Sequence, residues 1–233
     1  MGRILLALAT IGALAGAGVL AMEIGSNAAP AETEVLHPQR IVIGLDLSRS
    51  NPLIADPEFA ARVADRIAEQ VRQLGFASEV HIRTFGNYDP NSNTFAYDTV
   101  LSVRARPEAV AAEVRRLIAG TPYLVRSGKW RAQQNTNILA FLDNVSRAIG
   151  CQGMPTTVIL ASDGIEDSSY AKLDRGDSLP MPEAPSFQGC REFDIFGLGQ
   201  GTGSPRMTTR LRSEWSRWAR AAGFERFQGL NDW

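Results

Sequence analysis

Short apolar runs and longer amphipathic stretches alternate along most of this 233-residue chain. The short runs are bounded by turn-forming residues, which is typical of β-strands, and the longer stretches repeat apolar residues every three or four positions, as along one face of a helix. Strands that alternate with helices predict an α/β fold with a parallel, doubly wound sheet and helices on both faces. The predicted strands are 40–45, 79–85, 99–103, 156–161, 193–198 and 224–227, and the predicted helices are 56–74, 107–119, 137–149 and 208–222.

The second and third predicted strands differ from this pattern, because only the turn-rich segment 86–93 lies close between them. A short connection joins antiparallel neighbours, so we expect a mostly parallel six-stranded sheet with one antiparallel edge strand. Two segments are expected to be irregular. Residues 120–135 are basic and aromatic, and residues 166–189 are poor in apolar residues and contain three prolines.

The N-terminal residues 1–31 differ in kind from the rest of the chain. A basic start is followed by 19 uncharged residues, Ile4–Met22, and then by an Ala-Pro-Ala triplet that ends at residue 31, as in an export signal. An apolar run of this length can also just span a bilayer, so an uncleaved N-terminal membrane anchor is the alternative, and a buried helix of a cytoplasmic protein is a third. The first two predict an exported domain, periplasmic or extracellular and possibly anchored to the inner membrane. A polar linker, 32–38, then leads to the α/β domain at 39–229.

Composition adds two restrictions. The formal net charge of −1 gives no overall reason to expect a nucleic acid or an anionic membrane surface as partner. The chain has two histidines, His37 and His81, which are too few for a zinc site with three histidine ligands.

Three segments carry oxygen-rich side chains where predicted strands end or a predicted helix begins. Asp46, Ser48 and Ser50 follow the first strand, Thr136 precedes the third helix, and Asp163 follows the fourth strand. Carboxylates and hydroxyls are ligands for a hard divalent cation rather than for zinc or copper. Serine and aspartate also crowd loops simply to satisfy backbone groups, so the capping of turns and helices is the alternative role for all five residues.

Together these residues resemble the metal-ion-dependent adhesion site of the von Willebrand factor type A (vWA) family, whose signature is Asp-x-Ser-x-Ser, a distant Thr and a distant Asp. The resemblance covers roughly residues 39–229. It implies a Rossmann-like vWA fold with strand order 3-2-1-4-5-6, in which the first and fourth strands flank the point where the order reverses. Ligands of such sheets bind at the carboxyl ends there, which is where Asp46 and Asp163 are expected.

The resemblance also implies a cation and a role for each residue. Magnesium, or manganese, would be held directly by the hydroxyls of Ser48, Ser50 and Thr136, with the two aspartates acting partly through water. One coordination place would stay open for a carboxylate of another protein. Glu166 and Asp167 lie nearby in the sequence but are expected to belong to a solvated loop.

Residues beside the motif form a candidate partner surface. The segment 120–135 leads directly into Thr136, so Trp130 and Arg131 should lie at the metal-bearing end of the sheet, and tryptophan and arginine are enriched at interface hot spots. The alternative for Trp130 is that it packs inward and fills the loop. Arg49 stands where the family often has glycine, and it would either approach the incoming carboxylate or point away.

These inferences favour an exported, non-enzymatic domain that binds an acidic residue of a partner protein through a divalent cation. The alternative is a metal-dependent phosphoester hydrolase on a doubly wound sheet. Hydrolases that resemble the haloacid dehalogenases have Asp-x-Asp after the first strand, whereas Ser48 stands at the second of these positions here. Both lysines, Lys129 and Lys172, lie in the irregular segments, and the chain has no G-x-S-x-G turn.

Cys151 and Cys190 are the only cysteines of the chain and precede the fourth and fifth predicted strands. In the strand order that the resemblance implies these strands are neighbours, so both thiols would start from the same end of the sheet, opposite the metal. Export would expose them to an oxidising compartment, which predicts a disulfide, with two separate buried thiols as the alternative.

Overall fold

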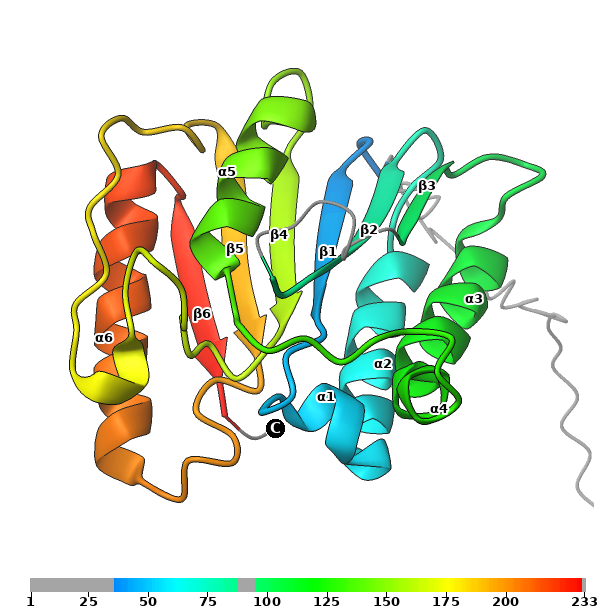
Figure 1. The fold of residues 1–233 in the computed structure, drawn as a ribbon. Coiled ribbons are helices and arrows are strands. Elements are labelled where there is room, and N and C mark those ends of the chain that lie inside the picture. The colour runs from blue at the N-terminus through cyan, green and yellow to red at the C-terminus, as the bar shows by residue number, and fades with distance from the viewer. Residues whose placement is uncertain (1–35, 88–94, 232–233) are drawn as a thin grey trace, which may run out of the picture. The chain divides into compact units, whose positions relative to one another are not determined.

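The computed structural model describes residues 36–87 and 95–231, and these contain a six-stranded sheet (Figure 1). The strand order is β3-β2-β1-β4-β5-β6. Each neighbouring pair is parallel except β2 and β3, which are antiparallel. The predicted fold class, the strand order and the antiparallel edge strand are therefore confirmed. The strands are β1 Arg40–Asp46, β2 Glu79–Phe85, β3 Ala96–Val100, β4 Thr156–Ala161, β5 Cys190–Phe196 and β6 Arg226–Leu230.

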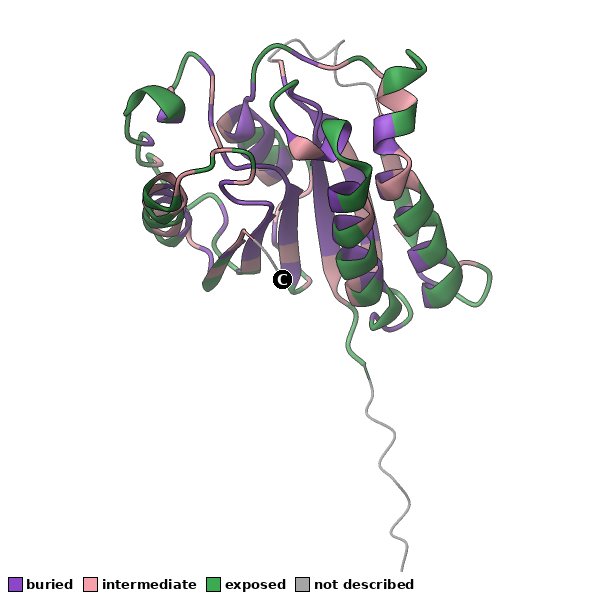
Figure 2. Ribbon diagram, turned by 90° about the horizontal axis from the view of Figure 1, so that it is seen from below, coloured by how far each residue is buried: buried purple, intermediate pink, exposed green. Residues whose placement is uncertain are grey.

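Helices cover both faces of the sheet. Helices α5 and α6 pack on one face, and α1, α2 and α3 pack on the other. Figure 2 shows the central strands buried between the two layers, while the helices are buried only on the side that faces the sheet. The helices are α1 Pro52–Ala55, α2 Pro57–Arg72, α3 Pro107–Ala119, α4 Thr121–Arg126, α5 Ile138–Ala148 and α6 Pro205–Ala222, with a short 3₁₀ helix, η2, at Leu173–Arg175.

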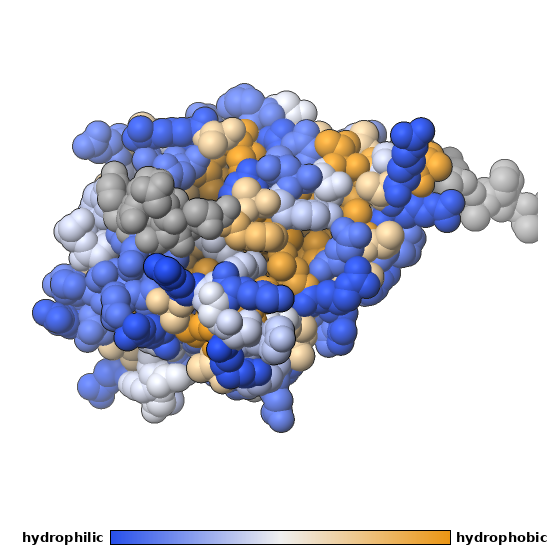
Figure 3. Space-filling view, turned by 45° about the vertical axis from the view of Figure 1, so that its right-hand side comes forward, coloured by the Kyte–Doolittle hydropathy of each residue, from blue (hydrophilic) through white to orange (hydrophobic). Residues whose placement is uncertain are grey.

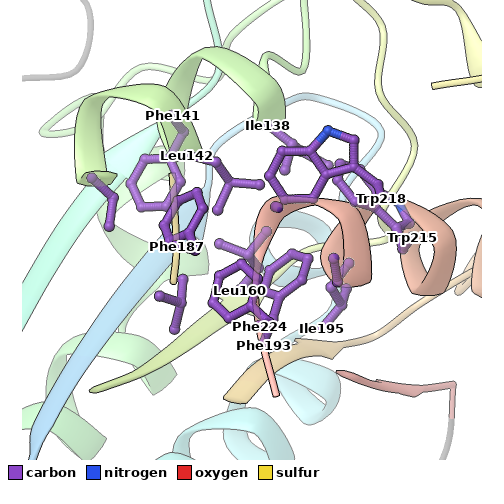
Figure 4. Close-up of a cluster of buried hydrophobic side chains, with 14 of the residues drawn as sticks. Ile138, Phe141, Leu142, Leu160, Phe187, Phe193, Ile195, Trp215, Trp218 and Phe224 are labelled. Atoms are coloured by element: carbon purple, nitrogen blue, oxygen red, sulfur yellow. The ribbon is translucent and has the colours of Figure 1, made fainter. Parts of the chain in front are cut away.

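The core under α5 and α6 is rich in aromatic side chains (Figure 4). The ring of Phe193 stacks on Phe224 with centroids 5.2 Å apart and meets Trp215 edge-on at 5.9 Å. Trp215 is fully buried, and its indole Nε1 donates a 2.7 Å hydrogen bond to the carbonyl of Gly164, which satisfies its polar atom. Because Gly164 follows Asp163, the aromatic core is connected directly to the loop that carries one of the motif residues.

The core on the other face is aliphatic, and helix α2 lies over its centre. Asp56 caps this helix by accepting the backbone N–H groups of Glu58 and Phe59, and Pro57 occupies the first helical position, as the sequence predicts. The buried residues of α2 then follow at helical spacing. They are Phe59, Ala60, Val63, Ala64, Ile67, Ala68 and Val71.

Several elements differ from the prediction. Residues 120–135 were expected to be irregular, but they begin with helix α4. A further short helix, α1, follows the motif loop, because Asn51 accepts the N–H of Leu53 as an N-cap and Pro52 takes the first position. Strand β3 lies three residues earlier than predicted, since its end is set by the pairing of Val100 with the start of β2.

The segment 166–189 has no long helix or strand, as expected, apart from η2. It nevertheless buries Leu179 and Phe187 in the aromatic core. Cys151 and Cys190 form a disulfide with their Cα atoms 5.0 Å apart, next to the amino ends of β4 and β5. The predicted disulfide is therefore confirmed.

The expected export signal or membrane anchor, 1–31, lies outside the described residues. The chain divides into residues 1–34 and a compact unit, 35–233. Among the described residues, no helix is both long enough and apolar enough to cross a membrane.

Candidate metal centre

The carboxyl ends of β1 and β4 lie side by side where the strand order reverses. The register pairs Leu45 with Ala161, so Asp46 and Asp163 both follow the last pair within two residues. Both aspartates are buried, with 0% and 1% of their surface exposed. Burial raises the pKa of Asp163, and the charge of Asp46 raises it further.

The loop after β1 is folded around Asp46. The carboxylate accepts the N–H of Ser48 at 2.8 Å through Oδ1 and the hydroxyl of Ser162 at 2.7 Å through Oδ2. Asn51 donates from Nδ2 to the carbonyl oxygens of Asp46 and Ala161, at 3.0 and 3.2 Å, and so ties the ends of β1 and β4 together. Neither Asn51 nor Ser162 was predicted as a site residue. For Asn51 the sequence does contain an indication, because an Asn-Pro pair is typical of the start of a helix.

Thr136 reaches the same end of the sheet from another direction. The N–H of Gln133 donates to the carbonyl of Leu47 at 2.8 Å, and the N–H of Arg49 donates to the carbonyl of Gln133 at 2.9 Å. Thr136 and Asp167 exchange two backbone hydrogen bonds of 3.3 and 2.9 Å. Thr136, which is 3% exposed, therefore lies between the loop after β1 and the loop after β4.

Helix α5 starts two residues after Thr136 and packs closely against β1. Gly44 permits this close approach, since a Cβ atom there would lie 2.8 Å from the ring of Phe141 and 2.7 Å from the side chain of Leu160. Any larger residue in β1 at this point would push α5 outward. Gly44 thus helps to set the position of Thr136 relative to the strand ends.

Glu166 is buried, so its expected place in a solvated loop was wrong. Its Oε2 accepts the N–H groups of Ile138 and Leu139 at 2.7 and 3.2 Å, and it thereby caps the start of α5. No local sequence pattern indicates this contact, because 28 positions separate Glu166 from Ile138. Asp167 is closer to expectation, with a side chain that is 36% exposed and paired with Lys172.

Three buried acidic groups gather at this end of the sheet, and burial raises the pKa of each. The pKa of Asp46 rises to about 6 through burial, although hydrogen bonds from the Ser162 hydroxyl and the Ser48 backbone N–H oppose the rise. The pKa of Asp163 rises to about 8, first through burial and then through the charge of Asp46. Burial also raises the pKa of Glu166 to about 7. A bound cation would stabilise the ionised forms of these groups and reverse the effect.

The oxygen atoms at this end fit a hard divalent cation. The Ser48 hydroxyl is buried and has no hydrogen-bond partner in the described part of the chain, and a buried polar atom left in this way is costly. A cation beside the hydroxyl would supply the missing partner. Ser50 lies two residues further on and is exposed, unlike Ser48 and Thr136. Within residues 36–87 and 95–231 no three His, Cys, Asp or Glu side chains form a metal-binding group, so a site here depends on hydroxyl ligands.

The expected partner residues lie around this end with different degrees of exposure. Arg49 and Arg131 are exposed, and the guanidinium of Arg49 lies 3.0 Å from the side-chain amide of Gln134. Trp130 is half-buried: its ring lies 5.1 Å from the ring of Phe95 and packs against the aliphatic core. This packing favours the alternative in which Trp130 fills the loop.

Comparisons with known proteins found similarity at the level of structure. No protein-family model and no curated protein matches the chain. The pilus adhesin SpaC from Lactobacillus rhamnosus GG, in its open conformation, aligns with a TM-score of 0.45 and 12% identity over 84% of this chain and 28% of the adhesin. The chain therefore spans less than a third of that adhesin's length.

Two further solved structures are similar at a comparable or lower level. An aerotolerance-related membrane protein from Bacteroides fragilis aligns with a TM-score of 0.44 and 15% identity, over 83% of this chain and 92% of that one. A von Willebrand factor type A structure from Catenulispora acidiphila aligns with a TM-score of 0.36 and 10% identity, over 82% and 33%. Similarity this low says nothing about what the chain binds. The strand order, the antiparallel edge strand and the position of the motif at the reversal of that order make the described domain a vWA-like one.

Proposed function

We propose that the domain binds a divalent cation, magnesium or manganese, and through it a carboxylate of a partner protein. The observation that carries this proposal is the Ser48 hydroxyl, which is buried next to Asp46 and has no hydrogen-bond partner among the described residues. Ser48, Ser50 and Thr136 would supply neutral oxygen ligands, and Asp46 and Asp163 would supply the charge.

This set of ligands leaves the cation attractive to an outside anion. Two carboxylates balance the charge of a divalent cation, and hydroxyl ligands add no negative charge. A magnesium ion with six coordination places would still have room for a further oxygen ligand. The exposed Arg49 and Arg131 would attract an acidic partner toward that place.

In this proposal the domain is an exported binding module and not an enzyme. Hydrolysis of a phosphoester would need a nucleophile and an acid at the cation. Ser48 takes the place of the second aspartate of an Asp-x-Asp pair, and the ammonium group of Lys172 is paired with Asp167. Export rests on the sequence of Ile4–Met22 and is part of the proposal.

Capture of proteins from an envelope extract tests this function. The full chain is immobilised and exposed to the extract with magnesium or with a chelator. We expect a partner that binds with magnesium, is released by the chelator and is lost with Asp46→Asn/Asp163→Asn. Arg72→Gln is the matched control, because Arg72 is exposed and lies at the far end of α2, where it pairs with Glu69.

Two outcomes would contradict the proposal. Capture that is equal with chelator and with magnesium would remove the role of the cation. Magnesium-dependent turnover of p-nitrophenyl phosphate that Asp46→Asn abolishes would favour the hydrolase instead.

A further inference from the structure

The outer face of helix α6 carries positive charge and no negative charge. Its arginines are exposed or half-buried, and they are Arg206, Arg210, Arg212, Arg217 and Arg220. The one acidic residue of the helix, Glu214, is buried on the inner side with Trp215 and Trp218. Because the formal net charge of the whole chain is −1, this face is a local concentration of positive charge and does not reflect a basic protein.

Three of these arginines and two serines line one shallow hollow on the helix, which we call the α6 hollow. Its residues are Arg212, Ser213, Ser216, Arg217 and Arg220. Arg212, Ser216 and Arg220 follow one another at intervals of four residues along the helix, and Ser213 and Arg217 form the neighbouring row. The two serine hydroxyls therefore lie among three guanidinium groups. A guanidinium group donates hydrogen bonds and accepts none, so the hollow suits an anion.

The contacts of these arginines leave donor groups available to a ligand. Arg220 has no hydrogen-bond or ion-pair partner in the part of the chain that the structure describes. Arg212 donates from Nε to the carbonyl of Gly229 at 3.2 Å, and its two terminal amino groups lie beyond that bond. Arg217 pairs with Glu214. Three positive charges less the charge of Glu214 leave about +2, which is more than one carboxylate would balance and close to the charge of a phosphate group.

Helix α6 lacks the apolar groups that a protein or a bilayer would contact. None of the exposed large hydrophobic side chains in residues 36–87 and 95–231 belongs to it. The side that carries β3 and α3 is different, because apolar groups there lie between the hydrophilic ones (Figure 3). Protein partners bind mainly through a buried apolar centre, and insertion into a bilayer also needs apolar side chains. A ligand of the α6 hollow would therefore be held by charge and hydrogen bonds.

We infer that the α6 hollow binds a phosphate group of a polyanionic chain. A guanidinium group binds two phosphate oxygens through parallel hydrogen bonds, and the serine hydroxyls add further donors. Arg206 lies 14 positions before Arg220, which is about 21 Å along the helix, so further phosphates of the same chain would reach Arg206 and Arg210. This inference does not rest on metal binding, so each can fail without the other.

Calorimetric titration of the full chain with linear polyphosphate tests the inference. A chelator is present throughout, so that a cation at the metal centre cannot contribute. Polyglutamate of matched charge and vesicles that contain phosphatidylglycerol are titrated in parallel, as probes for an acidic protein and for a lipid surface. Arg220→Gln is the test variant. Arg116→Gln is the matched control, because it makes the same change of charge at an exposed position on α3, which lies at the other edge of the sheet (Figure 1).

We expect Arg220→Gln to weaken polyphosphate binding about fivefold or more and Arg116→Gln to change it less than about twofold. Arg212→Lys/Arg220→Lys should weaken it about threefold, because lysine keeps the charge but cannot form the paired hydrogen bonds. Urea denaturation checks that each variant is folded. Unchanged affinity of Arg220→Gln or of the lysine variant would overturn the inference. Tighter binding of polyglutamate or of the vesicles than of polyphosphate would overturn it as well.

Discussion

Replacement of Asp163 by asparagine should stabilise the metal-free domain and abolish its response to magnesium. Burial and the charge of Asp46 raise the pKa of Asp163 from 3.8 to about 8. The folded state therefore keeps a proton that the unfolded chain releases, so this carboxyl group costs nothing below about pH 4 and lowers stability progressively up to about pH 8. At neutral pH the separation of about three pH units corresponds to about 4 kcal/mol. Asparagine does not titrate but keeps a desolvation cost of its own, so we expect Asp163→Asn to raise the free energy of unfolding by about 2–4 kcal/mol.

Urea denaturation at neutral pH, first with a chelator and then with magnesium, measures both effects. Magnesium at about 100 times its Kd should add about 3 kcal/mol to the wild type and nothing to the variant. Asp194→Asn is the matched control, because Asp194 is equally buried and burial raises its pKa to about 6, but it lies within β5. The Asp194→Asn variant should be more stable than the wild type and should still be stabilised by magnesium. A variant less stable than the wild type in chelator would refute the reasoning about the buried pair.

Three further predictions follow from the contacts described above. Replacement of both Cys151 and Cys190 by serine should lower the free energy of unfolding by about 4 kcal/mol, since a loop of about 40 residues is no longer closed; urea denaturation measures this. Trp130→Ala should lower the free energy of unfolding by about 1–3 kcal/mol with little change in partner capture, because the ring packs on Phe95. Weaker capture at unchanged stability would show instead that the ring belongs to the partner surface. Glu166→Ala should weaken magnesium binding and lower the free energy of unfolding by about 1–3 kcal/mol, because it leaves the N–H groups at the start of α5 unsatisfied. Glu166→Gln should retain most of the magnesium affinity and most of the stability.

The sequence predicts the number and order of the strands well, because most strands contain short apolar stretches bounded by turn-forming residues. Strand β2 lies where its alternation of apolar and polar residues predicts it, and β4 lies where its apolar run predicts it. Strand β5 begins three residues earlier than predicted, and β6 begins two residues later. Asp46 and Asp163 are brought together because both follow strands at the point where the order reverses, which a strand pattern and the family resemblance are enough to indicate. The half-exposed edge strand β3 was misplaced, since its alternation is weak and its ends depend on pairing with β2.

The supporting contacts of the centre could not be predicted in the same way. Glu166 caps a helix that begins 28 positions earlier, and Ser162 donates to a carboxylate 116 positions away. Such contacts depend on how two loops meet in space, which hydrophobic periodicity does not encode. Trp130 illustrates the same limit, because an aromatic residue in a basic loop fits a partner surface and an inward-packed plug equally well until its neighbour Phe95 is known.

Calorimetric titration of magnesium tests the central claim most directly. The wild-type chain should bind a single cation with modest affinity, because most of the proposed ligands are neutral. The double variant Asp46→Ala/Asp163→Ala should bind none while its circular dichroism spectrum shows that it is still folded. Equal magnesium binding by the wild type and by this folded variant would contradict the assignment of the metal centre.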